Sequence, residues 1–230
     1  MIETKSNITQ TLLDQLQEKA PKVAFMPDAE IVSAIRYLED KGIPNNKHED
    51  YKYCNIEAVF RKEFKTVEQS FNELTNANIA PLKIDEAINL VVVNGVYSED
   101  LSEKMIVKGL TVNSLNELSS SEKALLCSQA KSDADALIAL NTAFSANGLF
   151  LQIDKNNIIP MPLHIIYVNS GNANSVTNTR SFINIRANAQ VTLVESFYNI
   201  GSGKIFSNFV SEKLVGENAK LTCHTFQNEG

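Results

Sequence analysis

The sequence lacks the features that mark secreted, membrane and nucleic-acid-binding proteins. Its 230 residues contain no tryptophan, and its three cysteines, Cys54, Cys127 and Cys223, are scattered without a CxxC pair. Such a set is typical of reduced cytosolic thiols and argues against a disulfide framework or structural zinc. Nothing resembles a signal peptide, no run approaches the ~18 apolar residues of a membrane span, and the net charge of −6 offers no basic face. We expect a cytoplasmic protein with neither a membrane nor a nucleic-acid partner.

Helical patterns dominate the N-terminal part. Apolar residues at positions 8, 12, 13 and 16 predict a helix that stops before Pro21. A second helix is predicted from Asp28, as N-cap, to Gly42, and Asn55 can cap a third. A weaker pattern over 67–74 predicts a fourth helix.

Strand-like patterns begin at Ile84. The run INLVVVNGVYS (88–98) is rich in β-branched residues and contains Asn94-Gly95, a strong turn dipeptide. The segment 122–146 has helical spacing and is expected to be one helix, capped by Asn147-Gly148. Short strands and polar turns follow, so helices precede strands, which indicates an α+β layout.

The C-terminal part repeats itself with an offset of 30 residues. Residues 188–193 (NAQVTL) align with 218–223 (NAKLTC). Asn188 and Asn218 suit a turn that needs an unusual backbone conformation, and the residues after each asparagine alternate in polarity as in a strand. A fixed period of this size is typical of stacked repeats. We interpret each unit as one coil holding two strands, while an antiparallel meander remains open.

These patterns together predict the architecture. We expect an N-terminal helical domain over 1–83 and a mixed strand and helix connection over 84–148. Residues 149–230 are expected to form the first rungs of a right-handed β-helix, or β-solenoid. The second repeat stops at CHTFQNEG with no capping unit, and an open stack needs a cap. We therefore expect a fragment of a longer protein.

Gly201-Ser202-Gly203-Lys204 looks like part of a phosphate-binding loop. The Walker pattern requires a glycine at position 198, which is tyrosine, and a hydroxyl at 205, which is isoleucine. The following residues alternate like a strand, although a phosphate loop needs a helix there. The segment is interpreted as a turn, with no nucleotide site.

Other candidate groups also fail to form an active site. His48-Glu49 begins like HExxH, but position 52 is lysine. Cys223 and His224 are adjacent in a strand and so face opposite sides. We interpret Cys223 as a small core residue and His224 as a surface residue. His164 is interpreted as a strand position rather than a ligand. No Ser/His/Asp grouping can be assembled by spacing, so we predict no catalytic, cofactor-binding or metal-binding residue.

Three stretches resemble the SufB/SufD family of iron–sulfur cluster assembly scaffold proteins. The first, GIPNNKHEDYKYCNIEAVF (42–60), is similar to a family segment between N-terminal helices; Tyr51 replaces the usual tryptophan and Cys54 the usual threonine. The second, at 136–168, is similar to the family's entry from helix into strands. The third, RANAQVTLVESF (186–197), is similar to its recurring rung. The short helical N-terminus and few cysteines favour the SufD branch over SufB.

The resemblance implies a scaffold subunit of the SUF system without catalytic activity of its own. It implies pairing with a SufB-type scaffold subunit through the β-helix and with the SufC ATPase through a C-terminal helical domain. The iron–sulfur cluster would be held transiently by the full complex, with no cofactor resident in this chain. Self-association into a homodimer through the open β-helix edge is also expected. The role of the 47–54 loop, the cluster type and any involvement of flavin stay open.

Two rival functions fit a β-helix or a non-catalytic protein. A polysaccharide-active enzyme would place acidic and aromatic residues along one outer face. The outer rows instead offer Gln190, Thr192, Lys220 and Thr222. A purely structural adaptor that binds a partner through its helices is the second rival.

Overall fold

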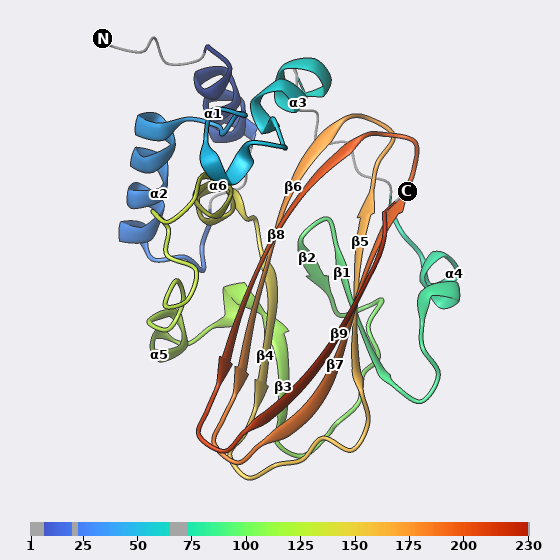
Figure 1. Ribbon diagram of the computed structural model, residues 1–230. Helices are drawn as coiled ribbons and strands as arrows, with labels where there is room; N and C mark the ends of the chain where they lie inside the picture. The colour runs from blue at the N-terminus through green and yellow to red at the C-terminus, as the bar shows by residue number, and fades with distance from the viewer. Residues whose placement is uncertain (1–6, 20–22, 65–72, 230) are drawn as a thin grey trace.

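The computed structural model describes residues 7–19, 23–64 and 73–229, and in it the strands form two sheets partly covered by helices (Figure 1). The helices are α1 (Asn7–Lys19), α2 (Asp28–Lys41), α3 (Ile56–Glu63), α4 (Asn76–Ile79), α5 (Ser120–Lys123) and α6 (Ala136–Phe144). Short 3-10 turns lie at Glu49–Tyr51, Ala80–Leu82 and Leu115–Glu117. None of the helices in these described ranges is long and apolar enough to cross a membrane.

From β4 onward, the strands alternate between the two sheets along the chain. Strands β1 (Ile88–Val93), β2 (Val96–Ser98), β5 (Leu163–Ser170), β7 (Gln190–Ile200) and β9 (Lys220–Asn228) form the sheet ordered β2-β1-β5-β7-β9. Strands β3 (Leu110–Ser114), β4 (Gly148–Ile153), β6 (Ser175–Ile185) and β8 (Ile205–Val215) form the sheet ordered β3-β4-β6-β8. The two sheets enclose an apolar core to which both contribute inward-facing side chains, among them Leu151, Leu163, Ile183 and Leu193.

The predicted right-handed β-helix is wrong. Both sheets are mixed, because β1 pairs antiparallel with β2 and β3 pairs antiparallel with β4. The fold is an α/β arrangement of two mixed sheets rather than an α+β β-solenoid. The 30-residue offset predicts which strands pair in parallel. It does not predict a strand that a hairpin adds antiparallel to its neighbour. Asn94 and Gly95, both at positive φ, form such a hairpin turn between β1 and β2.

The 30-residue offset itself is the register of the later strands. Leu163 pairs with Leu193, Ser181 with Ser211, and Val191 with Leu221, all in parallel. Asn188 and Asn218 precede their strands at φ 59° and 56°, as the sequence predicts. Each unit therefore contributes one strand to each sheet, and the antiparallel meander is not observed.

Three N-terminal helices lie where the sequence predicts them, but the prediction that Asp28 is the N-cap of the second is wrong, because Pro27 is the N-cap and Asp28 is the first residue of α2. Asn55 caps α3 by accepting a hydrogen bond from the Ala58 amide at 2.9 Å, and Gly42 ends α2. Together with α6 they pack over the outer face of the β3-β4-β6-β8 sheet around a core that includes Leu38, Phe60 and Val176 (Figure 1). Most of the fourth predicted helix, over 67–74, lies outside the described residues.

The single helix predicted over 122–146 is wrong. It is replaced by α5, a loop, and α6. Asp135 is the N-cap of α6, and its carboxylate accepts hydrogen bonds from the amides of Leu137 and Ile138. Cys127 has φ 61°, which a helix cannot accommodate, and its amide is bonded to Glu212 in β8. Tertiary hydrogen bonds thus replace helical ones. The helix ends at Ser145, and Gly148 already begins β4, so Asn147-Gly148 is not its cap.

Candidate functional site

Three charged or reactive side chains meet between the sheets near their β8 and β9 edges. Glu195 in β7, Lys213 in β8 and Cys223 in β9 all project from the core-facing side of their strands. The Glu195 carboxylate accepts from the Lys213 ammonium at 3.1 Å and from the Cys223 thiol at 3.2 Å, both through Oε2. Lys213 also contacts the Ser211 hydroxyl at 2.9 Å. We call Glu195, Lys213 and Cys223 the inter-sheet cluster.

The electrostatics of the inter-sheet cluster keep its thiol protonated. Partial burial of the sulfur raises the pKa of the Cys223 thiol, and the hydrogen bond and negative charge of Glu195 raise it further, while Lys213 opposes them. A protonated thiol is a weak nucleophile and a weak metal ligand. The other carboxylate oxygen of Glu195 is buried and has no hydrogen-bond partner among the described residues. The cluster is thus an acid-paired thiol whose reactivity depends on its neighbours.

The prediction that Cys223 is a small core residue is wrong. Its side chain follows the inward row, but it is exposed, because β9 is the last strand of its sheet in the described chain. His224 is exposed on the opposite side, as predicted. Within the described ranges no group of three or more histidine, cysteine or acidic residues could hold a metal ion.

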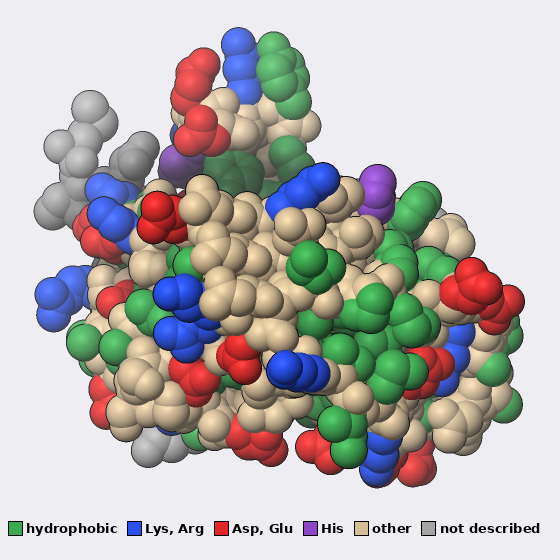
Figure 2. All heavy atoms as spheres, turned by 90° about the horizontal axis from the view of Figure 1, so that it is seen from below, with side chains coloured by type: hydrophobic (Ala, Val, Ile, Leu, Met, Phe, Trp, Pro, Cys, Tyr) green, Lys and Arg blue, Asp and Glu red, His purple; other side chains and the backbone are tan. Residues whose placement is uncertain are grey.

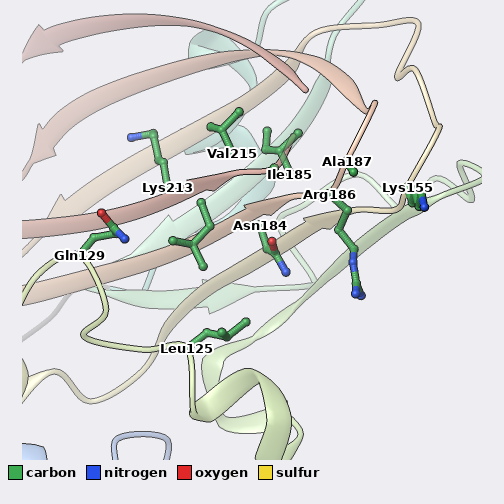
Figure 3. A pocket seen from close by; sticks show the side chains of 11 residues that line it. Leu125, Gln129, Lys155, Asn184, Ile185, Arg186, Ala187, Lys213 and Val215 are labelled. Atoms are coloured by element: carbon green, nitrogen blue, oxygen red, sulfur yellow. The ribbon is translucent and has the colours of Figure 1, made fainter. Parts of the chain in front are cut away.

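An open groove of about 700 Å³ lies outside the β3-β4-β6-β8 sheet, between its lower end and the segment that follows α5 (Figure 3). Leu125 and Leu214 contribute apolar surface, and Asn184 and Gln129 contribute amides. Its charged lining residues, Lys155, Arg186 and Lys213, are all basic. In Figure 3 the Lys213 ammonium is directed away from Arg186, in keeping with its bond to Glu195. The groove can accommodate an anionic group beside an apolar one, but it has no enclosed reaction chamber.

A buried ion pair joins β6 to β8 beneath the helices. Arg180 and Glu212 are both fully buried, and Arg180 Nη2 lies 2.6 Å from Glu212 Oε1. Glu212 also accepts from the amides of Cys127 at 3.1 Å, Gln129 at 3.2 Å and Ala130 at 3.3 Å. The pair therefore fastens the α5–α6 loop onto the sheet, which is a structural role. Sequence reasoning missed it, although charged residues inside two strands of otherwise alternating polarity were a signal.

The structure also assembles a Ser-His-Asn group that spacing did not reveal. His164 Nδ1 lies 2.8 Å from Asn89 Oδ1, and His164 Nε2 lies 2.5 Å from Ser196 Oγ. His164 is 75 positions from Asn89 and 32 positions from Ser196 in the sequence, so the three residues meet only because their strands stack in parallel. Burial lowers the pKa of His164 to about 4, and at most 2% of any of the three residues is exposed. The group is a sealed hydrogen-bond chain rather than a reaction centre, and His164 is a strand position as predicted.

The other motifs have structural roles. Residues 201–203 form the turn between β7 and β8, as predicted, and Lys204 pairs with Glu63 at 2.7 Å. In the 47–54 loop, Tyr51 donates its hydroxyl proton to Asp135 at 2.8 Å, which ties the loop to the start of α6. Burial and this bond raise the pKa of the Tyr51 phenol. Tyr53 and Cys54 are exposed.

Comparison with known families identifies the class of protein that this arrangement defines. A family model described as the SufBD protein N-terminal region matches residues 14–165, which is well over half of the chain. The chain belongs to this family. The match runs from α1 into β5 and so includes the helices, the hairpin and the first strands of both sheets.

Individual relatives agree with the family assignment. An iron–sulfur cluster assembly SufBD family protein of Synechocystis is 23% identical over 91% of this chain and 50% of its own length. The iron–sulfur cluster assembly protein SufD of Bacillus subtilis is 26% identical over 98% of this chain and 53% of its own. SufD of Escherichia coli is 22% identical over 81% of this chain and 43% of its own. The chain spans about half the length of these curated relatives.

Proposed function

We propose that this chain is part of a SufD-like scaffold subunit that works in iron–sulfur cluster assembly. The observation that carries the proposal is the family match over 14–165, together with relatives named for that process. The proposed role is non-catalytic and cytoplasmic. The cluster is cargo of the assembled complex, and no cofactor resides in this chain.

The low accessibility and low reactivity of the polar groups support a scaffold role over an enzymatic one. The Ser196–His164–Asn89 group is sealed from solvent, and a reaction centre needs access to substrate. The Cys223 thiol is held in its protonated, less reactive form by burial and by Glu195, which raise its pKa. The remaining surfaces suit association, because β8 and β9 are edge strands whose backbone groups can pair with another segment.

The partners proposed are a SufB-type scaffold subunit and the SufC ATPase. We place the SufB-type contact at the β8 and β9 edges, where Val215 and Phe226 are exposed. Large exposed apolar side chains on unpaired strands mark a surface that another chain covers. SufC would bind a part of the full-length protein other than these strands.

Co-purification from cells tests the proposal. The full-length protein carrying this sequence is tagged and co-expressed with a SufB-type subunit and SufC, and its ability to restore cluster assembly to a cell lacking SufD is scored. We expect both partners to co-purify and cluster assembly to return. Phe226→Asp should release the SufB-type subunit while SufC stays bound. Val32→Asp is the matched control, since Val32 is exposed on α2 and belongs to neither edge strand. Recovery of neither partner, with no restored assembly, would reject the scaffold role.

A further inference from the structure

The segment 104–108, between β2 and β3, presents apolar side chains to solvent. It has the sequence Lys-Met-Ile-Val-Lys and belongs to no helix or strand. Ile106 is fully exposed and Met105 is 48% exposed. The view from below shows apolar side chains gathered in one area of that face of the molecule (Figure 2). Contiguous exposed apolar surface marks an interaction site more often than isolated residues do.

The segment is held in place by its neighbours. Val107 packs against the core between the sheets, so the adjacent Ile106 is turned outward on a fixed support. The Asp154 amide donates to the Gly109 carbonyl at 2.8 Å, which joins the segment to the loop after β4. That loop carries Ile158, which is 65% exposed. Met105 and Ile106 are thus exposed apolar residues on a supported segment, and we call these two residues the 104–108 patch.

The backbone amides of the segment have no acceptor among the described residues, whereas the Val107 carbonyl accepts from Leu110. Among the described residues, the amides of 104–109 donate to no acceptor, while Glu103 before them donates to Asn89 and Leu110 after them donates to Val107. Backbone amides without an acceptor can pair with an extended peptide, and the exposed apolar side chains beside them can contact its side chains.

Lys104 and Lys108 are the first and last residues of the segment, and the acidic residues Asp100 and Glu103 precede it in the chain. Lys108 has no ion-pair or hydrogen-bond partner for its ammonium among the described residues, and Lys104 lies 3.9 Å from Asp100 with both side chains largely exposed. Lys155 adds a third cation on the loop after β4. Screened contacts such as Lys104–Asp100 contribute little, so these ammonium groups are available to carboxylates of another molecule.

We propose that the 104–108 segment is a docking site for an extended segment of a partner protein, with apolar residues at its centre and acidic residues at its ends. The partner's backbone pairs with the free amides, its apolar side chains cover Ile106 and Met105, and its carboxylates lie near Lys104 and Lys108. The proposal is independent of the iron–sulfur role and of the β8 and β9 edges.

A membrane surface explains the patch less well than a peptide does. Lipid tails offer no acceptors, so the amides of 104–109 would lose water without replacement. Asp100, Glu103 and Asp154 lie close in the chain to Lys104, Lys108 and Lys155, so the charge around the patch is mixed, whereas an anionic lipid surface presents charge of one sign. A peptide strand satisfies the amides and tolerates the mixed charge.

Binding of a designed peptide tests the proposal directly. The probe is a fluorescent peptide of alternating valine and threonine with aspartates at both ends, and binding is followed by polarization and amide hydrogen exchange. We expect binding to slow exchange at 104–108. Ile106→Thr should weaken it about tenfold, and Lys104→Glu with Lys108→Glu by a similar factor. Val32→Thr, at an exposed site on α2, is the matched control and should leave binding unchanged.

Three outcomes would overturn the proposal. The first is that the peptide does not bind, or binds without protecting 104–108. The second is that a lysine-ended peptide binds as well as the aspartate-ended one. The third is a different occupant. A dimer that depends on Ile106 in sedimentation would show that a second copy binds there, and binding of anionic vesicles in place of the peptide would show that a membrane does.

Discussion

Arg180 and Glu212 form a 2.6 Å ion pair in which neither side chain is exposed, and the Glu212 carboxylate also accepts hydrogen bonds from three amides of the loop between α5 and α6. Buried charges are costly unless they are paired and hydrogen-bonded. This pair therefore couples the helical layer to the β3-β4-β6-β8 sheet, because removing either partner leaves the other charge stranded.

We expect Arg180→Ala to lower the free energy of unfolding by about 3–5 kcal/mol, the cost of an unpaired buried charge. Urea denaturation followed by circular dichroism measures it. Arg186→Ala is the matched control, because Arg186 is exposed in the groove, and its effect should stay within about 0.5 kcal/mol. Equal effects of the two substitutions would show that the ion pair does not fasten the helical layer.

His164 should make stability depend on pH. Because burial lowers the pKa of its imidazole to about 4, the unfolded chain binds a proton at pH values where the folded chain does not. The contribution of the neutral His164 imidazole to the free energy of unfolding is therefore complete above about pH 6.5, the pKa of histidine in the unfolded chain, and is lost as the pH falls toward 4. Between pH 7 and pH 5 we expect a loss of about 2 kcal/mol in the free energy of unfolding.

Denaturation of His164→Gln at both pH values isolates this contribution, since the variant should lack that part of the pH dependence. His48→Gln is the control, as His48 is exposed. A pH profile that His164→Gln leaves unchanged would contradict the buried neutral imidazole.

The Cys223 thiol should become more reactive when Glu195 loses its charge. The carboxylate raises the pKa of the thiol by accepting its proton in a hydrogen bond and by its charge. Glu195→Gln should therefore lower the pKa of Cys223 and speed its alkylation by iodoacetamide near neutral pH, whereas Lys213→Met should slow it. Rates are measured by mass spectrometry of the Cys223 peptide, with the Cys54 peptide of the same sample as internal reference. If Cys223 is alkylated equally fast in both variants, the charges of Glu195 and Lys213 do not control the reactivity of the thiol.

The turn at 201–203 should tolerate no side chain at Gly203. A Cβ there would lie 2.2 Å from the Ala173 carbonyl oxygen, which is backbone and cannot rotate away. We expect Gly203→Ala to destabilise the fold by about 1–3 kcal/mol through displacement of the two stacked turns. Thermal denaturation compares it with Ser202→Ala, where the side chain is exposed and makes one weak contact with Asn172. A melting temperature that is equal for the two variants would indicate that the turns are not closely stacked.

Local sequence determined the elements whose signals are short-range. Asn55 caps α3, Asn94-Gly95 turns the β1–β2 hairpin, and Asn188 begins β7, each through the backbone preference of one or two residues. The 30-residue offset determined the register of the parallel strands, because equivalent residues of stacked units share the same apolar environment.

Tertiary structure decided what depends on distant partners. The loop between α5 and α6 replaces a helix because Glu212 in β8 binds its amides. The sheets are mixed because a hairpin adds β2 antiparallel to β1 and a long connection through α5 and α6 brings β4 antiparallel to β3, and a repeat offset records neither pairing. The His164 group arises only when strands about 30 or more residues apart stack side by side, and the inter-sheet cluster also needs β8 of one sheet to face β7 and β9 of the other. The sequence by itself thus specified turns, caps, register and family resemblance. Which polar groups meet, which are buried and which thiol lies beside a carboxylate were settled by the packing of the two sheets.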